Sequence, residues 1–176
     1  MHDFSDLIER CWGFTSSGLS EIETSILEEL KTSSATPLIK NLQMIQLSKV
    51  VFVVGAFSVF EAYLQKQLNC RNGFSDIKRI LKESDEELLF KKFSDIELAI
   101  NALKHGEGKS HQSLVTKKGG VLETLIKDNH NQFLNEGDVS EVDVLVDVNN
   151  KFVIECIDVI TKVTEFIKRN DSNSSE

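Results

Sequence analysis

The stretch Val50-Val-Phe-Val-Val-Gly-Ala-Phe-Ser-Val-Phe60 decides the fold of this chain. Apolar residues continue to Leu64 almost all round a helix, which is typical of a helix enclosed by other helices. Lys49 and Glu61 bracket the run, so it is shorter than the ~20 residues that span a bilayer. We therefore expect a central, buried helix of a soluble bundle and no membrane partner.

Helices are expected on both sides of this central one. Thr36-Pro37 supplies a capping hydroxyl and a proline at its start, and Asn72-Gly73 is a turn signal after its end. Apolar residues at steps of three and four predict a long helix from Phe4 to Leu30 before it. After it we expect a short helix over 75–82, then another that starts at a capping box, Ser84 to Glu87, and stops at Gly106.

The last part of the chain combines an irregular segment with one more helix. Periodicity weakens from Gly106 to Asp147. Asp147 or Asn149 is the expected cap of a final helix, whose apolar face consists of Phe152, Cys156, Val159, Ile160, Val163, Phe166 and Ile167. The sequence thus predicts an all-α, up-and-down bundle of four to five main helices. It forms one domain over residues 1–169, and residues 170–176 form a disordered polar tail.

Composition restricts the function classes. The formal net charge is −8, which disfavours non-specific attraction to nucleic acid or to an anionic membrane. The three cysteines, Cys11, Cys70 and Cys156, are far apart and form no Cys-x-x-Cys pair, so neither disulfides nor a structural zinc site is expected. The histidines lack partners at metal-ligand spacing. We expect a cytoplasmic protein without a metal or cofactor.

The richest chemistry lies where one predicted helix ends, at Asn101-Ala-Leu-Lys-His105-Gly106. Asn101 and His105 are four residues apart and therefore share a helix face. Histidine titrates near neutral pH and can exchange a proton with a 2′-hydroxyl or a leaving oxygen. Lys104 offers a cation to a phosphate. A polar stripe of this kind is also typical of a solvated helix face, so catalysis and mere exposure both fit the pattern.

Two segments together resemble a known family. The buried helix Val-Val-Gly-Ala-Phe-Ser-Val-Phe-Glu-Ala-Tyr-Leu (53–64), followed by a helix that ends at Asn101-Ala-Leu-Lys-His105-Gly106, is similar to the HEPN superfamily of helical domains. The resemblance covers roughly residues 38–110. It implies a bundle that commonly dimerises with its motif helices in a shared cleft. Active members are metal-independent ribonucleases of toxin–antitoxin, abortive-infection and CRISPR-linked defence systems.

The resemblance also assigns roles to residues. His105 matches the motif histidine, as the proton-transfer residue, and Asn101 matches the polar residue, with Lys104 in support. The motif arginine is missing, because positions 98–100 are Leu98, Ala99 and Ile100. Three functions follow: a bacterial defence or toxin-type protein that acts on RNA, a non-cleaving module that binds RNA, a nucleotide or a protein partner, and an antitoxin-like regulatory subunit. A homodimer is expected in each case.

Overall fold

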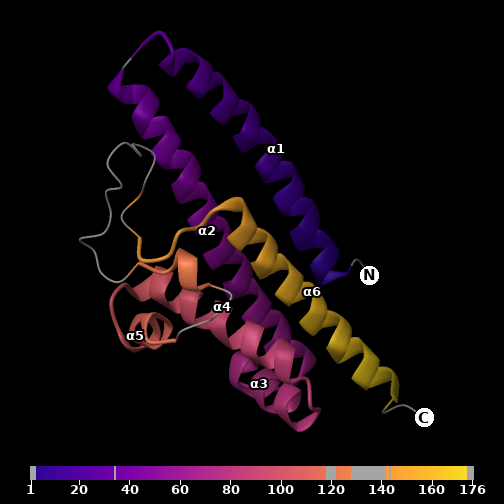
Figure 1. Ribbon diagram of the computed structural model, residues 1–176. Helices are drawn as coiled ribbons and strands as arrows, with labels where there is room; N and C mark the ends of the chain where they lie inside the picture. The colour runs from indigo at the N-terminus through magenta and orange to yellow at the C-terminus, as the bar shows by residue number, and fades with distance from the viewer. Residues whose placement is uncertain (1–2, 34, 118–121, 128–141, 143, 174–176) are drawn as a thin grey trace.

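The computed structural model describes residues 3–33, 35–117, 122–127, 142 and 144–173, and this part of the chain is all-α. Two long helices, α1 (Phe4–Leu30) and α2 (Thr36–Gln67), form an antiparallel hairpin. They are followed by α3 (Gly73–Glu83), α4 (Glu87–His105) and the short α5 (Lys109–Val115). The last described helix is α6 (Asn150–Asn173), which runs alongside the lower half of the hairpin (Figure 1). The predicted all-α bundle is confirmed.

The central helix is α2, as its sequence predicts. It packs against α1, α3, α4 and α6. Phe57, Phe60 and Leu64 have no exposed surface, and they belong to a core cluster that runs through all these helices. The expectation that α2 is enclosed on every side is wrong, however. Val51 remains 64% exposed, because no described helix covers that side of α2.

Alone among the helices of the described residues, α2 is long and apolar enough to cross a bilayer. Its most apolar window of 18 residues is 39% buried inside the bundle. Core helices of soluble proteins meet the same criteria of length and composition. The apolar run that we judged too short at Val50–Phe60 therefore belongs to a helix of 32 residues, ten of which are buried.

A second, smaller cluster holds the far end of the hairpin. It consists of Ile26 from α1 and Leu38, Leu42 and Ile45 from α2. Here the two helices pack only on each other and extend beyond α3 and α6 (Figure 1). The described part of the molecule therefore has a thick end, where all six helices pack together, and a thin end with two.

Several helix ends differ from their predicted form. Asn149 does cap α6, since its Oδ1 accepts a hydrogen bond from the Phe152 amide at 3.0 Å. Ser84 instead ends α3, and Glu86 precedes α4 without a side-chain cap, so the predicted capping box is wrong. The link between α3 and α4 is too short for Ser84 to serve both helices. Helix α6 continues to Asn173, so 170–173 are helical rather than tail, because elongation costs little once a helix is nucleated.

The predicted irregular segment is described only in part. It contains a 3₁₀ turn, η1 (Glu123–Leu125), and a single antiparallel bridge between Ile126 and Val146. Residues 118–121, 128–141 and 143 lie outside the described residues, as do 174–176 of the predicted tail. Next to the bridge, His111 of α5 is buried and its Nε2 lies 2.6 Å from the Lys127 carbonyl oxygen. This histidine therefore anchors α5 to the bridge.

Candidate binding pocket

The C-terminal half of α4 presents two of the predicted site residues, Asn101 and Lys104, toward α2 and α3. Glu97, Asn101 and Lys104 follow steps of four and three, which place them on one side of the helix. Gly106 ends α4 with φ 73°, and its amide donates to the Ala102 carbonyl at 2.8 Å. A left-handed residue at this position favours glycine, so the predicted helix stop is confirmed.

A pocket of about 210 Å³ lies where α4 crosses α2 and the start of α3. Asn101 and Lys104 line it, so the structure brings two of the three predicted site residues together. The other lining residues come from all three helices. They are Phe57, Ser58 and Glu61 of α2, Asn72 and Phe74 at the start of α3, and Glu97 and Ile100 of α4.

His105 does not line this pocket. It is exposed at the last position of α4, directly after Lys104. Successive side chains point about 100° apart around a helix. His105 therefore points away from the pocket wall that Lys104 lines. The structure thus separates the predicted proton-transfer residue from its two predicted supporting residues.

The floor of the pocket is apolar. Phe57 is fully buried, and its ring meets the Phe74 ring edge-on with 6.1 Å between the centroids. Ile100, which stands at the position of the missing motif arginine, is 3% exposed and joins the same core cluster. Only the half-buried Phe74 has appreciable exposed surface among these residues, and its ring is suited to contact a flat, uncharged part of a ligand.

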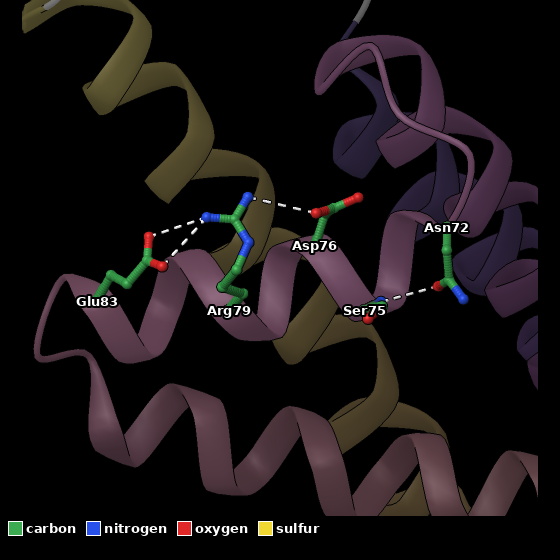
Figure 2. A network of polar contacts seen from close by, with 5 residues as sticks. All are labelled: Asn72, Ser75, Asp76, Arg79 and Glu83. Carbon is green, nitrogen blue, oxygen red and sulfur yellow. Dashed lines mark hydrogen bonds and ion pairs between the residues drawn. The ribbon is translucent and has the colours of Figure 1, made fainter.

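Polar groups surround this floor, and the sequence analysis did not predict three of them, which are Ser58, Glu61 and Asn72. Glu61 and Ser58 interrupt the apolar run of α2 three residues apart, which is the only sequence signal for them. Asn72 caps α3, accepting a hydrogen bond from the Ser75 amide at 2.9 Å (Figure 2). Glu97 belongs to the polar stripe of α4, and Lys78 of α3 pairs with it at 2.7 Å. This ion pair offsets one of the two carboxylates, so Glu61 and Lys104 set the charge of the pocket.

Close packing places Asn72 and Phe74 at the pocket. A Cβ on Gly73 would lie 2.8 Å from the carbonyl oxygen of Glu61 and 2.8 Å from the Cβ of Leu64. Real Cβ atoms do not approach so closely, so only glycine allows α3 to begin directly against α2. The pocket therefore depends on the glycine of the Asn72-Gly73 turn.

No arginine lines the pocket formed by the described residues. Arg79 of α3 is held by its own helix, with Glu83 at 3.0 Å and Asp76 at 3.3 Å (Figure 2). These carboxylates raise the pKa of Arg79, through hydrogen bonds first and charge second. Its guanidinium is therefore engaged in a surface network and does not replace the missing motif arginine.

Cys156 is the buried cysteine, and it is structural rather than reactive. Burial raises the pKa of the Cys156 thiol well above its usual value, which keeps it protonated inside the core. Within the described ranges, no group of three His, Cys, Asp or Glu side chains is placed to hold a metal ion. The pocket at α2, α3 and α4 is thus the site with the most varied chemistry in the described chain.

Comparisons with known proteins leave the family of this chain open. No protein-family model, no curated protein and no solved structure matches it.

Proposed function

We propose that this protein is a HEPN-like, cytoplasmic RNA-binding protein of a bacterial defence or toxin–antitoxin type system, and that its pocket holds one unstacked RNA base. The observation that carries this proposal is the composition of the pocket. Asn101 and Lys104 face aromatic and apolar side chains within one cavity of about 210 Å³, and His105 stands outside it. That arrangement favours binding over cleavage.

The chemistry of the lining suits a base. Proteins recognise single-stranded RNA by stacking bases on aromatic rings and by hydrogen bonds to the base edges. Phe74 is only half-buried and supplies a ring, and the amides of Asn72 and Asn101 supply both donors and acceptors. Lys104 is exposed at the rim, where it can meet a phosphate of the same nucleotide.

The negative net charge of the protein restricts which RNA ligands it can bind. A net charge of −8 gives little long-range attraction to RNA, so affinity has to come from local contacts. The end of α4 and the start of α5 carry a small positive charge, because Lys104 and Lys109 are exposed there and Glu107 is the one carboxylate between them. A short, single-stranded segment is therefore a better ligand than a long duplex.

Binding of a short fluorescent single-stranded RNA, followed by anisotropy at several salt concentrations, tests this proposal. Asn101→Ala should weaken binding by about tenfold, since one bidentate amide contact contributes about 1–3 kcal/mol. Lys104→Ala should weaken binding and lower the salt slope by about one counterion. Lys91→Ala, another exposed lysine of α4 paired with Glu87, is the matched control. Absence of RNA binding by the wild type would reject the proposal and favour a protein partner.

Cleavage of RNA is a second candidate, and one observation favours it. His105 and Lys104 are both exposed at the end of α4, so an RNA backbone that binds Lys104 and continues round the helix end would meet the imidazole. In this case His105→Ala abolishes cleavage of total RNA by the purified protein and relieves growth arrest on expression, while RNA binding stays unchanged. In the binding-only protein, the wild type leaves RNA intact and His105→Ala changes nothing.

A further inference from the structure

The polar groups of the pocket are divided between its walls. On the α2 wall, Glu61 is half-buried and forms no hydrogen bond or ion pair with the described residues. The Ser58 hydroxyl on the same wall donates to the Val54 carbonyl at 2.8 Å, so its oxygen remains as an acceptor. A carboxylate likewise accepts hydrogen bonds and donates none. The α2 wall therefore offers acceptors to a ligand.

The wall formed by α4 and the start of α3 adds donors. Asn72 uses its Oδ1 to cap α3, which leaves its amide NH₂ to donate to a ligand (Figure 2). Asn101 is half-buried, and its amide has no partner among the described residues. Lys104 brings a cation at the exposed rim. Glu97, the other carboxylate of the pocket, is neutralised by Lys78 at 2.7 Å. A ligand thus meets acceptors on the α2 side and donors on the α3 and α4 side.

Glu61 decides which part of an RNA segment can enter. Its carboxylate lines the pocket wall, whereas Lys104 lies at the exposed rim. A carboxylate repels phosphate and a lysine attracts it. An RNA segment that binds here therefore turns a phosphate to Lys104 and the edge of a base to Glu61. A half-buried acceptor without a donor is costly, so the base should supply donors to the carboxylate.

The four RNA bases differ in the donors that they can present to a carboxylate. Guanine carries two adjacent donors, N1–H and the N2 amino group, whose spacing matches the two carboxylate oxygens. Adenine and cytosine each carry one amino group beside a ring nitrogen that accepts, and uracil carries one N–H between two carbonyl oxygens. With these three bases an acceptor faces the second carboxylate oxygen and is repelled by it. Bidentate hydrogen bonds to an ionised acceptor are strong, so a carboxylate favours guanine.

We propose that the pocket selects guanine, with the Glu61 carboxylate accepting hydrogen bonds from N1–H and from the N2 amino group. The neighbouring edge of guanine carries two acceptors, O6 and N7, which suit the amide donors of Asn72 and Asn101. Guanine thus places its donors on the α2 side and its acceptors on the α3 and α4 side, as the division of the walls requires. This inference rests on the proposed binding of RNA and adds which base the pocket recognises.

A guanine of single-stranded RNA and a free guanine nucleotide share this chemistry, and the charge of the pocket favours the RNA. Among the described residues that line the pocket, Lys104 is the one cation that no carboxylate engages. It can meet one phosphate of a strand. The additional phosphates of guanosine triphosphate find no further cation in the lining. A strand with one guanine is therefore the better ligand.

Anisotropy with fluorescent oligouridine strands that differ at one central base tests the proposal. Wild type should bind the strand with a central guanine about tenfold more tightly than strands with adenine, cytosine or uracil there, which is the discrimination typical of one bidentate pair. Glu61→Gln keeps the shape of the side chain but replaces one acceptor oxygen by an NH₂ donor, so the four strands should then bind alike. Glu165→Gln is the matched control, because it removes an exposed carboxylate of α6 that is also without a partner among the described residues. It should keep the guanine preference.

Two altered ligands test which groups are recognised. Inosine lacks only the N2 amino group of guanine, so a strand with a central inosine should lose most of the preference. Guanosine triphosphate should bind more weakly than the guanine strand, and tighter binding would overturn RNA as the source of the base. Equal binding of all four strands by wild type, or a guanine preference that survives Glu61→Gln, would overturn the selection of guanine by Glu61 and leave RNA binding standing. Absence of binding to every strand would instead reject the proposed function, and this inference with it.

Discussion

The two ends of this molecule use the same central helix in opposite ways. At the thick end, Phe57, Phe60 and Leu64 of α2 are enclosed by α1, α3, α4 and α6. At the thin end, Leu38, Leu42 and Ile45 contact α1 alone, and the far side of α2 stays in solvent. The same apolar composition thus makes core where other helices pack on α2 and exposed surface where none does. The comparison teaches that neighbours, rather than the helix itself, decide which apolar residues become core.

The largest effect should come from the thick end. Phe60 has no exposed surface and contacts the rings of Phe4 (5.8 Å), Phe57 (6.2 Å) and Phe74 (6.4 Å). Phe60→Ala should lower the free energy of unfolding by about 4 kcal/mol, because it leaves a large cavity among helices that cannot collapse. Urea unfolding measures this loss. A cost below about 1 kcal/mol would mean that the thick end is as loosely packed as the thin one.

A substitution at the thin end should have a smaller and more local effect. Leu42→Ala should cost roughly 2–3 kcal/mol, the lower part of the usual range, since two helices can close over a cavity. Hydrogen exchange should accelerate for amides near Leu38–Ile45 while those near Phe93 keep their protection. Equal acceleration at both ends would show that the hairpin and the bundle unfold as one unit, which would remove the distinction between them.

Gly73→Ala tests the joint between α2 and α3 that forms the pocket. The added methyl group meets the Glu61 carbonyl oxygen and Leu64 Cβ, both at 2.8 Å, so α3 must shift away from α2. We expect a loss of about 1–2 kcal/mol, typical of overpacking, together with weaker binding at the pocket. Gly13→Ala is the control, because its methyl group enters open space and should stabilise α1 by up to ~1 kcal/mol.

Much of the thick end could be predicted from the sequence, because its signals are local. The run Val50–Phe60 identifies the central helix, and the periodic apolar face of α6 is buried from Phe152 to Ile167. Gly106 ends α4 as expected. The exposed side of α2 could not be predicted in this way, because Val51 and Val53 are identical residues and only the neighbouring helices distinguish their exposure.

The candidate site was predictable only in part, for the same reason. Asn101 and Lys104 share one helix, so their spacing alone places them together. Glu61 and Asn72 belong to other helices, and the close contact at Gly73 that brings them to α4 has no periodic signature. His105 shows the limit of spacing most clearly. His105 and Lys104 are neighbours in the chain, but only the packing of α2 and α3 on α4 decides which of the two side chains lines the pocket.

The smallest effect should come from the ion pairs that join α6 to α4 at the thick end. Lys92 of α4 lies 2.7 Å from Asp158 and 2.5 Å from Glu155 of α6. Partial burial by itself raises the pKa of Asp158, but hydrogen bonds from Lys92 and Lys162 outweigh it and lower the pKa below its usual value. A carboxylate with a lowered folded pKa stabilises the fold above its unfolded pKa, about 3.9, and this contribution is lost as the pH falls through the folded value.

Asp158→Asn should therefore cost less than about 1 kcal/mol at pH 7, since the pair is partly exposed. The difference from wild type should shrink as the pH falls below about 4, where the wild-type carboxyl takes up its proton. Urea unfolding of both proteins between neutral and acidic pH measures it, with Asp85→Asn on the exposed α3–α4 turn as the control. If the difference between wild type and Asp158→Asn stayed constant with pH, packing rather than charge would hold α6 to α4. The thick end would then owe its stability to apolar contacts alone, as the thin end does.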